Sequence, residues 1–291
     1  MTLPTVTARG IEFSYLERGP DDGPLALLLH GFPDSPTSYE PLMGALSDLG
    51  YRVVAPWMRG YAPTSLAPDS SYHVGSLGAD ANALHEALGG DGRAVLVGHD
   101  WGATAAYVAL AVAPQRWRRG VAMAVPPLRA MVRAFSSVSQ LQRSWYMWLL
   151  MTPLGEGAVS ANDYALIDEL WAQWSPGLDA ADASAAIRAA KSALEDPSNL
   201  TAALSYYRSM FSAPPIDPDA AAAQALALEV PSVPVLYVHG ANDGCIGIDE
   251  IGDPLASLAE GSRFVKVERA GHFVHLEQPD EVSQAVAAFL G

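Results

Sequence analysis

Two hydrophobic patterns alternate along the first part of the chain. Continuous apolar runs bounded by small or polar residues occupy 25–29, 52–55, 94–97, 120–124 and, much later, 233–238. Such runs are typical of strands buried on both faces of a sheet. Helical patterns at 39–49, 77–88 and 101–113 lie between the first four runs. This alternation predicts βαβ units, and therefore an α/β fold with a mostly parallel sheet flanked by helices.

Both ends of the chain add a further element. Residues 5–18 alternate between polar and apolar positions on either side of Gly10, which predicts an antiparallel hairpin at an edge of the sheet. Residues 276–290 predict a terminal helix.

The strand pattern is interrupted between Val125 and Val233. This segment is rich in alanine and is broken by prolines, so its composition favours helices. Because a parallel strand follows it, we expect a helical cap at 126–220 inserted into a core domain of 1–125 and 221–291; an unrelated second domain is the alternative. A cap would cover the carboxyl ends of the strands, where open α/β sheets bind ligands.

Charge and composition narrow the classes of partner. The chain has 17 basic and 32 acidic residues and a net charge of −15, which argues against binding to nucleic acid or an anionic membrane surface. Its single cysteine excludes an intramolecular disulfide. No secretory signal is visible, and no apolar run has the ~20 residues of a membrane helix. We expect a soluble, cytoplasmic protein.

A candidate nucleophile lies at Asp100. The segment 94–103 reads as a buried strand, a tight turn and a helix, with Gly98 and Gly102 flanking the turn as a nucleophile elbow requires. An aspartate before a helix is also a common N-cap, so the residue alone leaves both roles open.

Two later segments favour catalysis. His272 lies in a glycine-containing loop before the terminal helix, and Asp243 follows the strand at 233–238. The chain order elbow, acid, histidine is that of a catalytic triad. Asp249 and Glu250 are weaker candidates for the acid. A structural role of Asp243 in a turn is compatible with a catalytic role.

A candidate oxyanion site accompanies the elbow. The strand at 25–29 ends in a turn, His30-Gly31-Phe32-Pro33, whose backbone N–H groups could face the nucleophile. We expect the N–H groups of Phe32 and Trp101 to form this site.

Together these segments resemble the α/β-hydrolases with an aspartate nucleophile, the branch that contains epoxide hydrolases and haloalkane dehalogenases. The resemblance covers the whole chain. The chain departs from the family after Arg59-Gly60-Tyr61, where it has Ala62 and the family often has glycine. The motifs that carry the resemblance are His30-Gly31-Phe32-Pro33, Met58-Arg59-Gly60-Tyr61, Gly98-His99-Asp100-Trp101-Gly102, Asp243 and Gly271-His272-Phe273.

The resemblance implies an α/β-hydrolase fold and distinguishes two activities. Epoxide hydrolases use two cap tyrosines to protonate the leaving oxygen, and Tyr146 and Tyr207 match their positions, with Tyr206 as an adjacent alternative to Tyr207. Dehalogenases hold a halide with the tryptophan after the nucleophile and a second asparagine or tryptophan. Trp101 is present, but Phe32 occupies the usual asparagine position, and Trp148 is the remaining possible donor.

We therefore expect an epoxide hydrolase that forms an alkyl ester on Asp100 and releases a vicinal diol. Its partners would be a hydrophobic epoxide and water, and the chemistry requires no metal or cofactor. A haloalkane dehalogenase is the alternative, and a noncatalytic small-ligand receptor is a further one. The expected apolar substrate-binding residues are Trp101, Phe32, Trp148, Met151 and Phe211.

Overall fold

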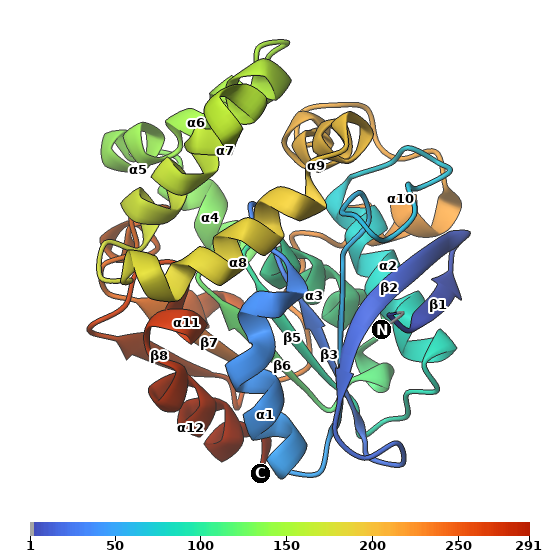
Figure 1. The fold of residues 1–291 in the computed structure, drawn as a ribbon. Coiled ribbons are helices and arrows are strands. Elements are labelled where there is room, and N and C mark those ends of the chain that lie inside the picture. Colours follow the sequence, from blue (N-terminus) through green and yellow to red (C-terminus); the bar gives the residue numbers. More distant parts are fainter. Residues whose placement is uncertain (1–2) are drawn as a thin grey trace.

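The computed structural model describes residues 3–291, and for residues 180 and 182 the backbone alone. A sheet of eight strands, ordered β1-β2-β4-β3-β5-β6-β7-β8, runs through the described chain (Figure 1). β2 is antiparallel to both of its neighbours, and all other neighbouring pairs are parallel. The α/β class and the edge hairpin are confirmed. The strands are β1 (Thr5–Ala8), β2 (Ile11–Arg18), β3 (Leu25–Leu29), β4 (Arg52–Pro56), β5 (Val95–His99), β6 (Arg119–Met123), β7 (Val235–Gly240) and β8 (Arg263–Val267).

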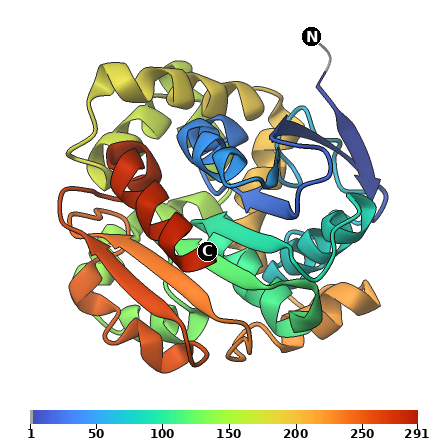
Figure 2. The ribbon, with the colours of Figure 1, turned by 90° about the horizontal axis from the view of Figure 1, so that it is seen from below.

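Helices cover both faces of this sheet (Figure 2). On one face α1 (Glu40–Asp48) packs against α12 (Pro279–Leu290), and on the other α2 (Val74–Ala87) packs against α3 (Trp101–Val112). Successive strand residues point to opposite faces, so Leu27 belongs to one hydrophobic core and Leu28 to the other. This double burial explains the uninterrupted apolar sequence of β3.

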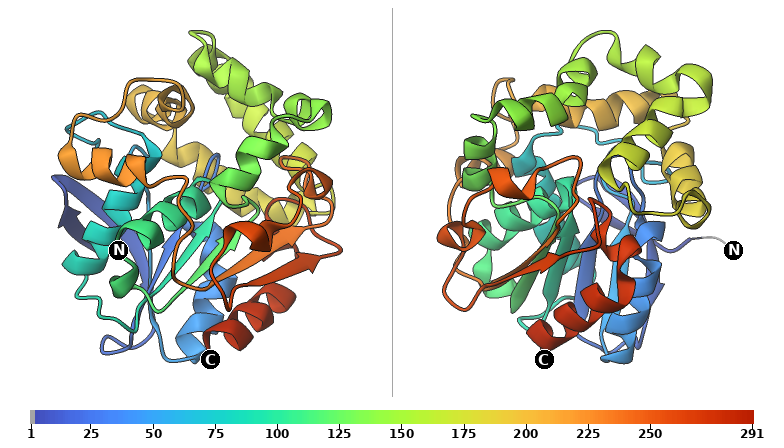
Figure 3. Two further views of the ribbon diagram at one scale, coloured as in Figure 1. Left: turned by 180° about the vertical axis from the view of Figure 1, so that it is seen from behind. Right: turned by 90° about the vertical axis from the view of Figure 1, so that its left-hand side faces the viewer.

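The segment between β6 and β7 is helical and lies above the carboxyl ends of the parallel strands (Figure 3). α10 (Pro218–Ala225) packs against core helix α2, where the Gly75 N–H donates to the Gln224 side chain at 2.9 Å. α7 (Gly155–Trp174) leaves helical geometry between Ala161 and Tyr164. The helices of this segment are α4 (Leu128–Ala134), α5 (Val138–Arg143), α6 (Trp145–Met151), α7 (Gly155–Trp174), α8 (Ala180–Ala193), α9 (Pro197–Ser209) and α10 (Pro218–Ala225).

The strand β8 lacks the continuous apolar run of the other parallel strands. It forms the edge of the sheet, and four of its five residues are exposed or only partly buried, so its sequence needs no such run. Within residues 3–291, none of the helices is both long and apolar enough to cross a membrane. The remaining short elements are α11 (Val274–Glu277), η1 (Pro36–Tyr39), η2 (Pro114–Arg116), η3 (Ile248–Glu250) and η4 (Pro254–Ser257).

Candidate active site

Asp100 occupies a sharp turn between β5 and α3. Its backbone has φ +52° and ψ −121°, a conformation that is uncommon for a residue with a side chain. The two flanking glycines are required by close packing. A Cβ on Gly98 would lie 2.2 Å from the Gly102 carbonyl oxygen, and one on Gly102 would lie 1.8 Å from the Leu29 carbonyl oxygen. The turn therefore has the geometry of a nucleophile elbow.

The carboxylate of Asp100 points away from its own helix. It accepts no capping hydrogen bond from the N–H groups of α3, although Asp100 occupies the N-cap position. Its Oδ1 atom instead accepts a hydrogen bond of 2.9 Å from the Phe32 N–H. Among the described residues, no corresponding bond from the Trp101 N–H reaches this carboxylate, so of the two expected donors only the Phe32 N–H contacts it.

His272 lies between two buried carboxylates. Its Nδ1 atom is 3.0 Å from Oδ2 of Asp243, and its Nε2 atom is 3.5 Å from Oδ2 of Asp100. The other oxygen of Asp243 accepts the N–H groups of Cys245 and Ile246 at 2.7 and 2.9 Å. The loops after β5, β7 and β8 thus bring the three residues together in the order of a triad.

The weaker candidates for the acid lie elsewhere. Asp249 and Glu250 belong to η3; the Asp249 side chain is exposed, and the Glu250 carboxylate accepts a hydrogen bond from Ser139. The imidazole of His272 is bonded to Asp243 instead.

These contacts shift the proton affinities of all three groups. Burial by itself lowers the pKa of His272, but the carboxylates of Asp243 and Asp100 outweigh it and raise that pKa to about 10. Burial raises the pKa of each carboxylate, yet the charge of His272, together with its hydrogen bond to Asp243, brings both pKa values below their ordinary range. All three shifts favour an imidazolium between two carboxylates.

Two tyrosines from separate helices of the segment between β6 and β7 face Asp100. Tyr146 of α6 and Tyr207 of α9 are buried, and their rings meet edge to face with centroids 5.9 Å apart. The Tyr146 hydroxyl lies 3.3 Å from Sγ of Cys245, whereas the Tyr207 hydroxyl has no hydrogen-bond partner among the described residues. Burial raises the pKa of each phenol well above the usual value for tyrosine, so both phenols keep their protons.

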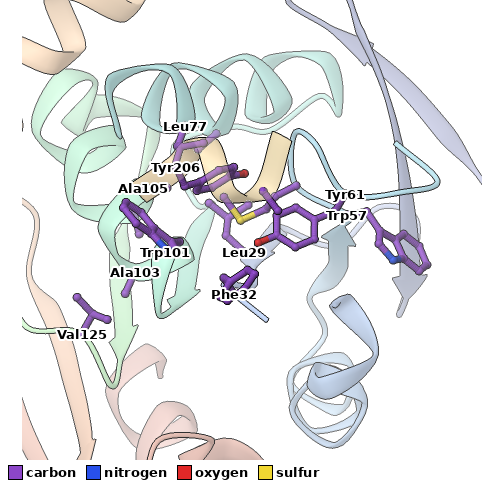
Figure 4. Close-up of a cluster of buried hydrophobic side chains, with 14 of the residues drawn as sticks. Leu29, Phe32, Trp57, Tyr61, Leu77, Trp101, Ala103, Ala105, Val125 and Tyr206 are labelled. Atoms are coloured by element: carbon purple, nitrogen blue, oxygen red, sulfur yellow. The ribbon is translucent and has the colours of Figure 1, made fainter. Parts of the chain in front are cut away.

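Tyr206, the alternative to Tyr207, faces the core. Its hydroxyl donates to the Arg59 carbonyl at 2.8 Å, and its ring packs against Tyr61 and Trp101 (Figure 4). A helix turns consecutive residues by about 100°, which is why the neighbours differ in direction. Of this pair, only Tyr207 lines the cavity above Asp100.

This cavity has a volume of about 100 Å³ and mostly apolar walls. The sequence did not single out the three methionines among its walls, because apolar character alone does not reveal which side of a helix faces the cavity. The lining residues are Val74, Asp100, Trp101, Thr104, Val125, Leu128, Met131, Phe135, Tyr146, Met147, Tyr207, Met210 and Ile246.

Not all of the expected substrate-binding residues lie at this cavity. Trp101 lines it, and Phe32 contacts the Tyr207 ring with centroids 5.4 Å apart. Trp148 and Phe211 are instead exposed and stack on each other, and the half-buried Met151 is also outside the lining, as far as the described residues show. α6 directs Tyr146 and Met147 inward, which turns Trp148 toward solvent.

Two clusters contain side chains of the metal-ligand type within the described residues. One is Asp243, Cys245 and His272, of which Asp243 and His272 are already bonded to each other. The other is buried behind the elbow and consists of Asp34, His99 and His275. Both oxygens of Asp34 already accept hydrogen bonds, from the Ser35 N–H and the Ser38 hydroxyl.

Comparison with known proteins identifies the family. The model of the alpha/beta hydrolase fold matches residues 24–279. The chain is an α/β-hydrolase. It is 28% identical to epoxide hydrolase 1 of Caenorhabditis elegans over 98% of the chain and 69% of that protein. It is also 28% identical to epoxide hydrolase A of Mycobacterium tuberculosis, over 98% of the chain and 96% of that protein.

Solved structures agree with this assignment. The crystal structure of an epoxide hydrolase from Vigna radiata matches this α/β-hydrolase with a TM-score of 0.77 and 26% identity, covering 99% of the chain and 97% of that structure. The expected α/β-hydrolase fold is thereby confirmed, together with the resemblance to epoxide hydrolases.

Proposed function

We propose that this α/β-hydrolase converts a hydrophobic epoxide to a vicinal diol through an alkyl ester on Asp100. The observation that carries the proposal is that Asp100 of the core and Tyr146 and Tyr207 of the helical insertion line one apolar cavity. Such an arrangement suits a ring that is attacked at carbon while its oxygen receives a proton. The names of the relatives support the same reaction.

In the first step, Asp100 attacks an epoxide carbon and the ring C–O bond breaks. The departing oxygen is a strongly basic alkoxide, so it requires a proton, which Tyr146 or Tyr207 supplies. The lowered pKa of Asp100 keeps the nucleophile ionised within an apolar cavity. The products of this step are an ester, a new hydroxyl group and a tyrosinate.

Formation of the ester then changes the role of His272. It removes the charge of Asp100, one of the two carboxylates that raise the pKa of the imidazole. His272 therefore releases its proton, which restores the tyrosine, and becomes a general base held in place by Asp243.

Water completes the cycle. His272 takes a proton from a water molecule, which adds to the carboxyl carbon of Asp100. We assign stabilisation of the resulting oxyanion to the N–H groups of Phe32 and Trp101. Collapse expels the alkoxide, which recovers the proton from the imidazole; ionisation of the freed Asp100 then restores the resting site.

The cavity also supports the class of substrate. Its aliphatic, thioether and aromatic walls favour a hydrophobic epoxide, and the cap, which we assign to 126–220 over a core of 1–125 and 221–291, provides most of them. Dehalogenation has less support, because a halide needs two side-chain donors. Trp101 lines the cavity, but Trp148 is exposed and the Phe32 ring offers no N–H.

One turnover with excess enzyme in oxygen-18 water tests the mechanism. Hydrolysis of the ester at its carboxyl carbon places the isotope in the peptide that contains Asp100, as mass spectrometry would show. Isotope found only in the diol would refute the ester. Release of halide from matched haloalkanes without diol formation would instead favour a dehalogenase, and tight binding of epoxides without turnover would favour a receptor.

A further inference from the structure

The cysteine of this chain lies beside Tyr146, one of the two proposed proton donors. Cys245 is the only cysteine in the sequence and is buried. Its Sγ atom is 3.3 Å from the hydroxyl oxygen of Tyr146, and among the described residues it is the one hydrogen-bond partner of that hydroxyl. The mechanism above assigns no role to this contact.

The backbone around the thiol is held on both sides. The Cys245 N–H donates to the catalytic carboxylate of Asp243 at 2.7 Å, and the Cys245 carbonyl accepts from the side chain of Gln140 at 2.9 Å. Gln140, on α5, also accepts the Gly247 N–H at 3.0 Å. The thiol is thus fixed in a loop that is bonded both to Asp243 and to α5. The next helix, α6, carries Tyr146.

The direction of this hydrogen bond depends on what occupies the cavity. A thiol is a weak donor and its sulfur a weak acceptor, whereas an epoxide oxygen accepts a phenol proton well. With an epoxide bound, the Tyr146 O–H points to the substrate oxygen, and the S–H of Cys245 donates to the phenol oxygen. The thiol retains its proton throughout, because burial raises its pKa well above the usual range.

Resting on the proposed function, we infer that Cys245 is a positioning residue for ring opening. Its S–H orients the Tyr146 hydroxyl toward the epoxide oxygen and donates to the tyrosinate that forms when the phenol proton moves to that oxygen. No proton leaves sulfur, and no bond to sulfur forms or breaks.

The contact with Cys245 also makes the surroundings of the Tyr146 and Tyr207 hydroxyls different. The Tyr207 hydroxyl faces the same cavity without a partner among the described residues, and its ring is held by packing against Phe32 and Trp101. A tyrosinate at Tyr146 would have the thiol of Cys245 as its donor, whereas the side chains of Trp101 and Tyr146 are the groups that lower the pKa of Tyr207. The two phenols therefore differ in the group that stabilises the tyrosinate.

Single-turnover kinetics test this role through the two chemical steps. In Cys245→Ala and Cys245→Val, alkylation of Asp100 slows roughly three- to tenfold, the effect of one neutral hydrogen bond, while hydrolysis of the ester stays within about twofold. Cys245→Ser recovers part of the alkylation rate because it restores a donor. Equal slowing of both steps, or unchanged alkylation in both variants, would overturn the inference.

A double-mutant cycle separates this role from packing. In the Tyr146→Phe background, Cys245→Ala has no further effect on alkylation, because the oxygen that the thiol contacts is already gone. If Cys245→Ala slows alkylation as strongly in that background as in the wild type, the thiol acts through packing and the inference fails.

The single thiol permits a measurement that needs no turnover. The Raman S–H stretching band belongs to Cys245 alone, and donation to oxygen lowers its frequency. We expect a lower frequency in the wild-type protein with a bound, unreactive cyclic ether than in Tyr146→Phe with the same ligand. Equal frequencies would refute the contact, whereas a shifted band in a protein that hydrolyses no epoxide would refute the proposed function alone.

Discussion

The Nε2 atom of His272 lies 3.5 Å from Oδ2 of Asp100, an ion-pair contact rather than a hydrogen bond. The same imidazole is hydrogen-bonded to Asp243 through Nδ1, so it lies beside two carboxylates. In the proposed mechanism Asp100 is consumed as a nucleophile, and Asp243 remains ionised. The proton affinity of His272 therefore depends on the chemical state of Asp100.

Replacement of the base should trap the intermediate. In His272→Gln, Asp100 still attacks the epoxide, but no group accepts the proton of water, so ester hydrolysis slows by about 10²- to 10⁴-fold. Intact-mass spectrometry should show one substrate added per chain, located on the peptide containing Asp100. Asp100→Asn is the control and should gain no mass. An adduct on any other residue would contradict the assignment of the nucleophile.

The stability of the protein should depend on the ionisation of His272. Its pKa in the folded protein, about 10, exceeds its value of about 6.5 in the unfolded chain. Its stabilising contribution is therefore complete below about pH 6.5 and is lost as the pH rises from there through 10. Relative to His272→Gln, the free energy of unfolding should fall by up to about 1.4 kcal/mol per pH unit in this window.

Urea denaturation of both proteins between pH 6 and 10 measures this difference. At the acid end the sign reverses for Asp100 and Asp243, whose pKa values are lowered, so their contribution is lost as the pH falls through their folded values. Parallel curves for wild type and His272→Gln across the alkaline window would show that the two carboxylates do not hold the imidazole charged.

The Tyr207 hydroxyl should contribute to activity at the expense of stability. Because it has no partner among the described residues, Tyr207→Phe breaks no hydrogen bond in the free protein and removes a buried polar group. We expect unchanged stability or a gain of about 1 kcal/mol, with alkylation slowed about tenfold or more. Tyr146→Phe, which loses the contact with Cys245, is the matched variant and should show no such gain.

The position of the nucleophile should be sensitive to one methyl group at Gly31. A Cβ there would lie 2.2 Å from Oδ1 of Asp100, so Gly31→Ala forces the carboxylate off the Phe32 N–H. A displacement on the order of 1 Å reduces the alkylation rate about 100-fold. Gly157→Ala is the control, since its Cβ meets no atom within 4 Å. Wild-type alkylation in a folded Gly31→Ala protein would disprove the close approach.

The proposed triad was within reach of the sequence because Asp100 and Asp243 follow recognisable strands and His272 lies in a glycine-containing loop before the predicted terminal helix. The carboxyl ends of parallel strands meet at one edge of a sheet, so Asp100, Asp243 and His272 converge without any knowledge of side-chain packing. The tyrosines of α9 could not be assigned in this way. Helical periodicity alone left Tyr206 and Tyr207 open. The structure separates them, because Tyr206 donates to the Arg59 carbonyl whereas Tyr207 lines the cavity.

The walls of the cavity were least predictable. Trp148 and Phe211 are as apolar as the residues that line it, yet they stack on each other at the surface. Met131 and Met210, which do line the cavity, carry no distinguishing local pattern. Hydrophobicity indicates that a side chain gains from burial, but which surface buries it depends on how the helices pack.

The sequence by itself determined the βαβ order, the tight turn at Asp100 and the presence of a helical insertion, since these follow from local periodicity and from the small side chains that a sharp turn demands. Only the tertiary structure decided which side chains share the cavity, and that the thiol of Cys245 meets the hydroxyl of Tyr146. That contact joins residues 99 positions apart. No local pattern encodes it, because it depends on the packing of α6 over the loop that follows β7.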